Sequence, residues 1–312
     1  MAKIVVLGTL NADLYVEVHR LPKVQETLPA ISGGEIRPGG KGANTAAAAS
    51  LLGISTYILG QVGSDAASLM ILNELSSRNV HLDYLIKLQN IPSGQAIIIL
   101  QTGGENSIIS IRGANQAWTT LPETMKQPIL QANALMIQRG IPDTVNLEAA
   151  SLAHSNGVLV VMDAGGKNGP ISDELLSNID ILSPNSIEIE ELTGIAGDIE
   201  AAALVLINRG IKHVVVKMSK EGSLYIGQHG RYKQDIFTVC DIPVVDTTGA
   251  GDCFTAALVA RLVEIGNLEF DAFKEAMHFA SVAAFLSVTK KGAMESMPTR
   301  EQVNRYLGFK GP

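Results

Sequence analysis

The segment from Val244 to Phe254 is the part of the sequence that most constrains how this chain folds. A short β-branched run leads into two threonines and two glycines, and apolar residues at helical spacing follow, which predicts a helix. Glycines let a ligand approach the backbone, and the first free amides of a helix attract anions. The sequence therefore predicts an anion hole formed by Gly249, Ala250 and Gly251.

Asp252 lies in the first turn of this predicted helix. A carboxylate there would repel a bound phosphate, so it needs a purpose besides phosphate binding. The natural purpose is to accept a proton from a hydroxyl group that attacks the phosphate. An ordinary helix start with a Thr/Asp cap is the alternative, and this segment by itself does not decide between the two.

The composition narrows the class of protein. The chain has 312 residues, of which 46% are apolar and 18% charged, as is ordinary for an α/β protein with a large core. It has 31 acidic and 24 basic residues and no basic cluster, which argues against a nucleic-acid partner. Two cysteines are too few for a disulfide framework. The sequence opens with a strand-like segment rather than a leader, and no apolar run reaches membrane-spanning length. We expect no membrane association and a cytoplasmic location.

Two polar residues follow the predicted first strand, which ends at Gly8. Asn11 and Asp13 come at the carboxyl end of that strand, the edge at which α/β sheets bind ligands. Their amide and carboxylate groups are suited to hold sugar hydroxyls. An Asx turn is the alternative explanation for the pair.

A glycine-rich segment precedes an alanine-rich helix that is predicted to run to about Leu52. Glycines beside a lysine and an asparagine let a hydroxylated ligand approach the backbone closely. The segment is not a Walker A loop, because a glycine rather than Ser or Thr follows the lysine. A glycine-rich turn is the alternative. The candidate ligand contacts are Gly39, Gly40, Lys41 and Asn44.

Helices and strands alternate regularly after Trp118, which predicts a mostly parallel, doubly wound sheet with helices on both faces. Other strand-like pieces do not alternate with helices and indicate a small separate sheet, either a lid over the site or a surface that pairs between subunits. We expect one α/β domain over residues 1–312, with lid strands interleaved at about 14–19, 26–36, 94–101 and 106–113.

A further polar pair follows a predicted strand at residues 179–182. Asn185 and Glu188 are three residues apart, so they lie on one side of a starting helical turn. They are suited to hold a hydrated Mg²⁺ with its phosphates, since Mg²⁺ keeps several waters and few protein ligands. A helix cap with a capping box is the alternative.

These motifs, in this order, resemble the ribokinase-like sugar kinases of the phosphofructokinase B type, and the similarity extends over nearly the whole chain. The resemblance implies an α/β fold with a β-sheet lid and ATP-dependent transfer of the γ-phosphoryl group to the 5-hydroxyl of ribose. It rests on four elements: Asn11 with Asp13, Gly39 to Asn44, Asn185 with Glu188, and Asp246 to Asp252.

The resemblance also implies roles for individual residues. Asp252 would be the base, and Asn185 and Glu188 would act near phosphate and magnesium, Glu188 through water. The nucleotide would contact Asn185 together with Ser219, Gly222 and Gly251. The implied sugar contacts are Asn11, Asp13, Gly39, Gly40, Lys41, Asn44 and Asp252.

The same family is activated by a monovalent cation, usually potassium, and its lid commonly makes a dimer contact. The resemblance thus implies K⁺ beside ATP and Mg²⁺, and a homodimer through the lid sheet. The implied potassium ligands, several of them through backbone carbonyls, are Asp246, Thr248, Ser287, Lys290, Gly292 and Ser296.

The sequence departs from the family pattern at two positions. A glutamate that contacts the sugar is expected in the segment 138–142, and the matching residue is Gly140. Its absence should weaken ribose binding, and the room left by glycine could admit a bulkier sugar or a nucleoside. Ser219 stands where a glycine is common, and this change should only adjust nucleotide contacts.

Three alternatives follow from these departures and from the motifs. A kinase for another sugar or a nucleoside stays open because of Gly140. A weakly active sugar-binding homologue also stays open, although pure binding needs no base at Asp252. A Rossmann dehydrogenase is the least supported alternative, because its fingerprint needs Gly-x-Gly-x-x-Gly after the first strand and Gly8 is followed by Thr-Leu-Asn.

Overall fold

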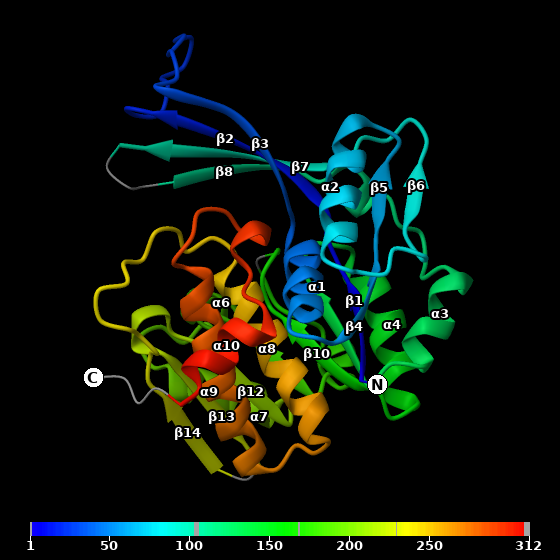
Figure 1. Cartoon of the computed structure of the whole chain (residues 1–312). Coiled ribbons are helices and arrows are strands. Elements are labelled where there is room, and N and C mark those ends of the chain that lie inside the picture. The colour runs from blue at the N-terminus through cyan, green and yellow to red at the C-terminus, as the bar shows by residue number, and fades with distance from the viewer. Residues whose placement is uncertain (1, 103–105, 168, 229, 309–312) are drawn as a thin grey trace.

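The computed structural model describes residues 2–102, 106–167, 169–228 and 230–308. Its body is built on an eight-stranded sheet that is parallel from β4 to β12, whereas β13 and β14 are antiparallel to their neighbours (Figure 1). In spatial order the sheet consists of β14 (Gly230–Gln234), β13 (Ser223–Gly227), β12 (His213–Lys217), β11 (Ile181–Ser183), β10 (Leu159–Asp163), β9 (Ala134–Gln138), β1 (Lys3–Leu7) and β4 (Ser55–Leu59).

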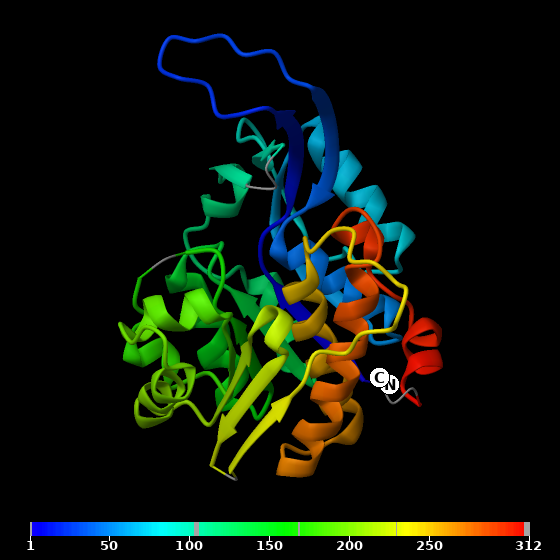
Figure 2. The same cartoon turned by 90° about the vertical axis from the view of Figure 1, so that its left-hand side faces the viewer.

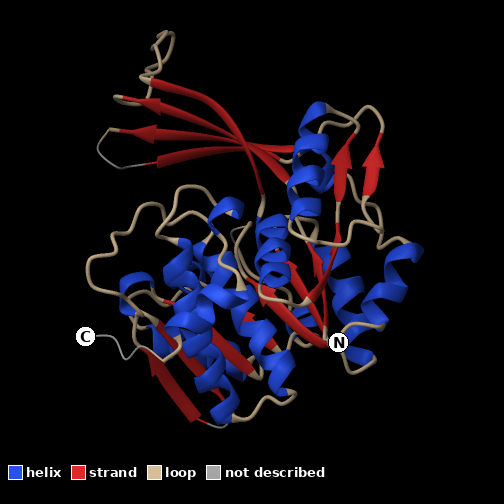
Figure 3. Ribbon diagram, in the orientation of Figure 1, coloured by secondary structure: helices blue, strands red, loops and turns tan. Residues whose placement is uncertain are grey.

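Helices cover both faces of this sheet (Figure 3). Alternate residues of β1 show the division, because Ile4 and Val6 pack into one core and Val5 and Leu7 into the other. The first core is covered by α1 (Lys41–Leu51), α2 (Ala66–Ser77), α8 (Ala250–Ile265), α9 (Phe270–Ser287) and α10 (Arg300–Tyr306). The second is covered by α3 (Glu123–Leu130), α4 (Asp143–Ser155), α5 (Asp173–Leu176), α6 (Ser186–Thr193) and α7 (Ile199–Asn208). The predicted doubly wound α/β sheet is confirmed.

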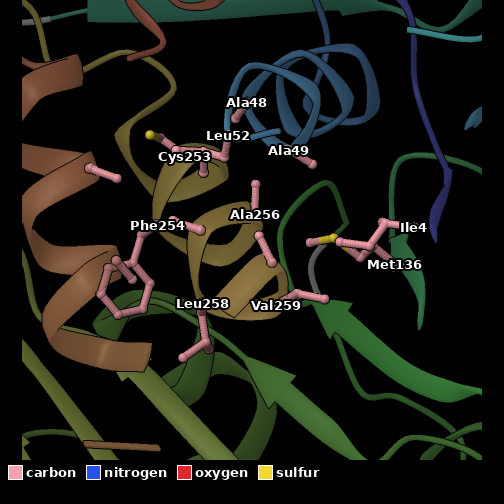
Figure 4. Packing of buried hydrophobic residues seen from close by; sticks show 14 of the residues in the cluster. Ile4, Ala48, Ala49, Leu52, Met136, Cys253, Phe254, Ala256, Leu258 and Val259 are labelled. Atoms are coloured by element: carbon pink, nitrogen blue, oxygen red, sulfur yellow. The ribbon is translucent and has the colours of Figure 1, made fainter. Parts of the chain in front are cut away.

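Helix α8 lies at the centre of the first core (Figure 4). Its small residues Ala256 and Val259 face β1 and β9, while Phe254 points toward α9. Every residue from Asp252 to Ala260 is buried. A helix held on all sides cannot shift without opening the close-packed core, so its first turn has a fixed position.

A second sheet of four strands, in the order β3-β2-β7-β8, projects from the body in both views (Figures 1 and 2). Its strands are β2 (Asn11–Val18), β3 (Ser32–Gly39), β7 (Gly94–Gln101) and β8 (Asn106–Ile111). Smaller elements are the pair β5 (Gln61–Gly63) and β6 (Ile86–Leu88), and three 3₁₀ turns at Gly113–Gln116, Ser219–Glu221 and Met294–Ser296.

Two lid strands differ from their predicted bounds: β2 begins earlier, at Asn11 and not at about 14, and β3 both begins and ends later. Residues 26–31 form a loop instead of a strand, and β3 runs from Ser32 to Gly39. Pro29 has no N–H to donate to a ladder, and pairing with β2 continues as far as Asn11 opposite Gly39. The lid strand therefore leads directly into the glycine-rich segment before α1.

The carboxyl ends of β1, β10, β11 and β12 all lie at the same edge of the main sheet, as parallel strands require. They bring the loops after Leu7, Asp163, Ser183 and Lys217 to the side on which α1 and α8 begin. Of the helices in the described part of the chain, none is both long and apolar enough to cross a membrane.

Candidate active site

The glycine-rich segment brings α1 against the end of β1. Gly40 has φ of 95°, and a Cβ there would lie 2.8 Å from the carbonyl oxygen of Thr9, so both backbone conformation and space require glycine. The helix begins one residue later at Lys41. Asn44 is three residues further on and therefore points to the same side as Lys41.

Asp252 is the point at which α1 and α8 meet. It is the third residue of α8 and is 5% exposed. Asn44 Nδ2 donates to its Oδ2 at 2.9 Å, and Lys41 Nζ lies 3.3 Å from its Oδ1. Residues far apart in the sequence thus hold one buried carboxylate in a fixed orientation at a helix N-terminus.

The start of α8 offers free backbone amides beside this carboxylate. Gly249 precedes the helix with φ of 78°, a left-handed conformation that favours glycine. The Ala250 amide donates to the Thr247 carbonyl at 3.2 Å, whereas Gly249 and Gly251 have no hydrogen-bonded amide partner among the described residues. Of the three amides predicted to bind an anion, those of Gly249 and Gly251 are therefore available to a ligand.

Buried acceptors without partners lie on the lid side of Asp252. Within the described residues, Asp13 Oδ1 and Asn44 Oδ1 are buried and accept no hydrogen bond. Burial raises the pKa of Asp13 to about 7, the Asn11 side chain opposes this rise, and the Asp252 charge adds to it. Asn11 itself accepts a bond of 2.8 Å from Asn115 Nδ2. Unpaired buried acceptors are costly, and donors such as sugar hydroxyls would satisfy them.

A cavity of about 680 Å³ opens on the other side of Asp252. Its polar part lies along the predicted nucleotide residues, and its remaining wall is largely apolar. The predicted residues on the lining are Lys41, Asn185, Glu188, Ser219, Gly222, Gly249, Ala250, Gly251 and Asp252. The apolar wall includes Ile236, Val244, Ala284, Phe285 and Val288. A polar end beside free amides and an apolar end suit a nucleotide, with phosphates at the former and a base at the latter.

Asn185 and Glu188 form a capping box at the start of α6. Asn185 Oδ1 accepts from the Glu188 amide and Glu188 Oε2 accepts from the Asn185 amide, each at 2.8 Å. Burial, with the nearby Asp163 charge, raises the pKa of Glu188 above its ordinary value. Glu188 Oε1 is outside the box, at the cavity. The cap that the sequence left as an alternative is therefore present, and one carboxylate oxygen is still free of it.

Magnesium fits this donor set only as a hydrated ion. The described residues contain no group of three or more His, Cys, Asp or Glu side chains placed to hold a metal. Glu188 Oε1 is nevertheless an oxygen donor on the cavity wall, and Mg²⁺ commonly uses one or two carboxylates together with water and phosphate. Glu188 is the residue that would hold it through water.

Asp246 joins the loop before α8 to the loop after α9. Its Oδ1 accepts from the amide and hydroxyl of Thr248 at 2.9 and 2.7 Å, and its Oδ2 accepts from the Gly292 amide at 2.9 Å. Burial would raise the pKa of Asp246, but these bonds outweigh it and hold the pKa below its ordinary value. The hydroxyls of Ser287 and Ser296 each donate to a carbonyl at 2.8 Å. Of the predicted cation ligands, the structure links Asp246 directly with Thr248 and Gly292.

Gly140 does not leave an empty space. A Cβ at this position would lie 2.4 Å from Thr9 Cγ2, so the methyl of Thr9 fills the volume next to the glycine. Thr9 is β-branched and buried, and its χ1 is stiff. Thr9 therefore occupies the space directly at the Cβ position of residue 140, and the choice between ribose and a bulkier acceptor stays a prediction.

The backbone conformation of Ser219 explains why a glycine is common at this position in the family. Its φ is 53°, in the left-handed region, and it starts the 3₁₀ turn that ends at Glu221. A serine there carries strain that a glycine would not. The serine therefore makes the backbone at the edge of the cavity less favourable than a glycine would.

Two charged residues at the site were missed from the sequence. Asp163 ends β10 and Lys217 ends β12, and their side chains pair at 2.5 Å. Asp163 also lies 3.4 Å from Lys41. Burial would raise the pKa of Asp163, but the two lysines hold it well below its ordinary value. Their place at the carboxyl ends of predicted strands was the available signal.

The fold and the site define a kinase of the carbohydrate class, because Asp252 lies between a cavity suited to a nucleotide and two buried acceptors without partners. Residues 1–300 match the pfkB family of carbohydrate kinases. A ribokinase of Arabidopsis thaliana is 42% identical over 98% of this chain and 81% of its own length. A ribokinase of Haemophilus influenzae is 34% identical over 97% of each chain. The chain belongs to the pfkB family of carbohydrate kinases.

Comparison with solved structures also finds a ribokinase. The structure of Arabidopsis thaliana ribokinase complexed with ribose and ATP matches with a TM-score of 0.92 and 41% identity, over 99% of this chain and 100% of that chain. The family membership expected from the sequence motifs is confirmed.

Proposed function

We propose that this protein transfers the γ-phosphoryl group of ATP to the 5-hydroxyl of D-ribose and so forms ribose 5-phosphate. The observation that carries this proposal is the position of Asp252, between two buried acceptors without partners and the start of the nucleotide cavity. Ribose supplies hydroxyl donors on the first side, and ATP supplies phosphates on the second. The ribokinase relatives and the ribose- and ATP-bound neighbour support this choice of substrates.

The chemistry follows from the two sides of this carboxylate. Asp252 accepts the proton of the attacking hydroxyl, and Asn44 and Lys41 hold its two oxygens in place. The free amides of Gly249 and Gly251 bind the phosphoryl oxygens at the positive end of α8. When Mg²⁺ is bound, it neutralises charge on the phosphates, and Glu188 is the residue that holds its water shell.

The sugar contacts are assigned to the acceptor side. Asn11, Asp13 and Asn44 receive hydroxyl hydrogens, while the segment from Gly39 to Lys41 lets the sugar lie close to the backbone. The nucleotide is assigned to Asn185, Ser219, Gly222 and Gly251 on the cavity wall.

A panel of acceptors tests the substrate. ADP release from ATP should be fastest with D-ribose among pentoses, hexoses, 2-deoxyribose and nucleosides, and the product should carry the phosphate on the 5-oxygen by ³¹P–¹H correlation. Faster turnover of a nucleoside or a hexose would reject ribose, whereas ATP binding without any turnover would leave only a binding protein.

We also propose a potassium site between the loops that Asp246 joins. Asp246 supplies negative charge, and carbonyl and hydroxyl oxygens around Thr248, Ser287, Lys290, Gly292 and Ser296 supply the remaining ligands. A cation there would fix the loop that leads into the anion hole without touching substrate. Replacing sodium by potassium at constant ionic strength and saturating magnesium should raise kcat. If kcat is the same with both cations, the proposed potassium site is wrong.

Finally, we propose a cytoplasmic homodimer formed through the lid sheet. Both edge strands of the lid sheet expose large apolar side chains that a partner would cover. On β8, Ile108, Ile109 and Ile111 are 60%, 53% and 41% exposed, and on the opposite edge strand β3, Ile36 is 55% exposed. Light scattering should give twice the mass of one chain. The double variant Ile108→Lys, Ile109→Lys should be a monomer. If its molar mass stays that of a dimer, the subunits do not pair through β8.

A further inference from the structure

We infer that Lys217 is a further catalytic residue, whose ammonium group contacts the transferred phosphoryl group beside the first turn of α8, and that Asp163 is its positioning residue. This inference rests on the proposed phosphoryl transfer. It adds a cation that the sequence motifs do not contain.

The position of Lys217 supports a contact with phosphate. It is the last residue of β12, its side chain is 12% exposed, and it lines the nucleotide cavity. Its Nζ lies 3.8 Å from where a Cβ on Gly251 would be. Gly251 carries one of the free amides of the anion hole, so the ammonium group and this amide face the same small region.

The contacts of the ammonium group tie it to that region. Nζ lies 2.5 Å from Asp163 Oδ2 and donates to Thr255 Oγ1 at 3.2 Å. Thr255 donates in turn to the carbonyl of Gly251 at 3.0 Å. Among the described residues these are its two hydrogen-bond acceptors, which leaves a third N–H for an anion in the cavity.

Asp163 connects the two lysines of the site. Its Oδ1 lies 3.4 Å from Lys41 and accepts from the Gly165 amide at 3.0 Å. Both lysines line the nucleotide cavity, and Lys41 reaches from Asp163 to Asp252 whereas Lys217 reaches to Thr255 beside Gly251. One buried carboxylate therefore sets the separation between a cation at the base and a cation at the anion hole.

Phosphoryl transfer develops negative charge that the Lys217 ammonium group can stabilise. The sugar oxygen forms a bond to the γ-phosphorus as the bond from that phosphorus to the β,γ-bridging oxygen breaks. The hydroxyl proton goes to Asp252, and the electron pair of the broken bond stays on ADP. Fixed donors near the phosphoryl and leaving oxygens stabilise this charge in a site shielded from water. A buried ammonium beside Gly251 is such a donor.

A double-mutant cycle separates this role from mere neutralisation of Asp163. Lys217→Met should lower kcat by roughly 10²-fold or more, and it should do so both in the wild type and in an Asp163→Asn background. Asp163→Asn with Lys217→Met buries no unpaired carboxylate from this pair, so it keeps the test valid if the single Lys217 variant is unstable. If Lys217→Met changes kcat by less than about threefold in the Asp163→Asn background, the lysine acts only through Asp163 and the inference is wrong.

Nucleotide binding gives a readout that needs no sugar. The Kd of adenosine 5′-(β,γ-imido)triphosphate with Mg²⁺ should rise roughly tenfold or more in Lys217→Met, as expected for a charge-assisted hydrogen bond, while the Kd of AMP should stay within about twofold. Lys233→Met, an exposed change on β14 away from the cavity, is the charge-matched control and should leave both Kd values unchanged.

An equal change for both nucleotides, or no change, would overturn the contact. Because this titration contains no acceptor, it can fail while ribose phosphorylation stands. It can equally succeed if another sugar proves to be the substrate.

Discussion

The two sides of Asp252 are built on different principles. On the acceptor side the buried oxygens of Asp13 and Asn44 have no partners within the described structure, and burial raises the pKa of Asp13. On the nucleotide side the Asn185–Glu188 capping box is satisfied within the protein, the amides of Gly249 and Gly251 have no protein partner among the described residues, and the remaining wall is largely apolar. The first side thus has buried oxygens that lack donors, whereas the second combines an apolar wall with free backbone amides.

This difference explains how each substrate is selected. A site with buried unpaired acceptors rejects molecules that lack matching hydroxyls, because the cost of the empty acceptors stays. An apolar cavity with backbone amides accepts a nucleotide mainly by shape and by the charge of its phosphates. We therefore expect changes on the acceptor side to affect sugar choice and stability. On the nucleotide side we expect changes at the cavity edge, away from the anion hole and Lys217, to have smaller and local effects.

The largest effect is expected where the two sides meet. Asp252→Asn should lower kcat by roughly 10²- to 10⁴-fold, because a general base acts only in the transition state, while sugar and ATP affinity change little. Steady-state kinetics with calorimetric Kd values measure both. Asp271→Asn, an exposed aspartate in the first turn of α9, is the control and should keep wild-type kcat. A variant at position 252 that keeps more than about a tenth of kcat would show that it is not the base.

The second prediction is that the buried Asp13 on the acceptor side lowers the stability of the folded protein at neutral pH. The pKa of Asp13 is raised from 3.8 to about 7, so the folded state resists ionisation that the unfolded state undergoes. Stability is therefore lost as pH rises from about 4 to about 7, by up to about 4 kcal/mol, and is level above that. Asp13→Asn should remove this loss.

Urea unfolding at pH 4, 6 and 8 measures the effect. The gain in free energy of unfolding for Asp13→Asn should be near zero at pH 4 and largest at pH 8, while ribose affinity falls. A gain that is the same at all three pH values would show that Asp13 ionises normally in the folded protein.

A third experiment examines the pair of Thr9 and Gly140. Gly140→Glu alone should destabilise the fold, because its Cβ would meet the Thr9 methyl at 2.4 Å. With Thr9→Ser the methyl is absent, and the new carboxylate can accept sugar hydroxyls. The double variant should then lower the KM for ribose roughly tenfold with little change in kcat.

Thr9→Ser alone is the control for this pair and should keep the wild-type KM. If the double variant folds but binds ribose no better, the sugar does not approach residue 140 and the acceptor pocket lies elsewhere.

The smallest effect is expected on the nucleotide side. Ser219→Gly relieves a left-handed backbone conformation and should raise the free energy of unfolding by less than about 1 kcal/mol, since glycine also costs unfolded-state entropy. Lys220→Gly on the same turn, where φ is not positive, should lower it instead. Thermal unfolding compares the two variants, and a loss of stability in Ser219→Gly would mean that its side chain contributes more than its backbone costs.

The sequence by itself determined the elements and most of the candidate site. The period of apolar residues predicts the sheet and its helices, because burial requires that pattern. The glycines at 40 and 249 predict tight helix starts, because few other residues tolerate positive φ. Motif order was enough to identify the family, which the comparisons confirm.

Only the tertiary structure decided which side chains meet. Lys217 and Asp163 pair from the ends of two different strands, and Thr9 fills the space beside Gly140 from a loop after another strand. The bounds of a lid strand also differ from the prediction, with β3 running from Ser32 to Gly39. Local sequence patterns report burial and backbone preference, whereas the distance between two side chains depends on how whole strands and helices pack, and that packing is fixed by the core as a unit.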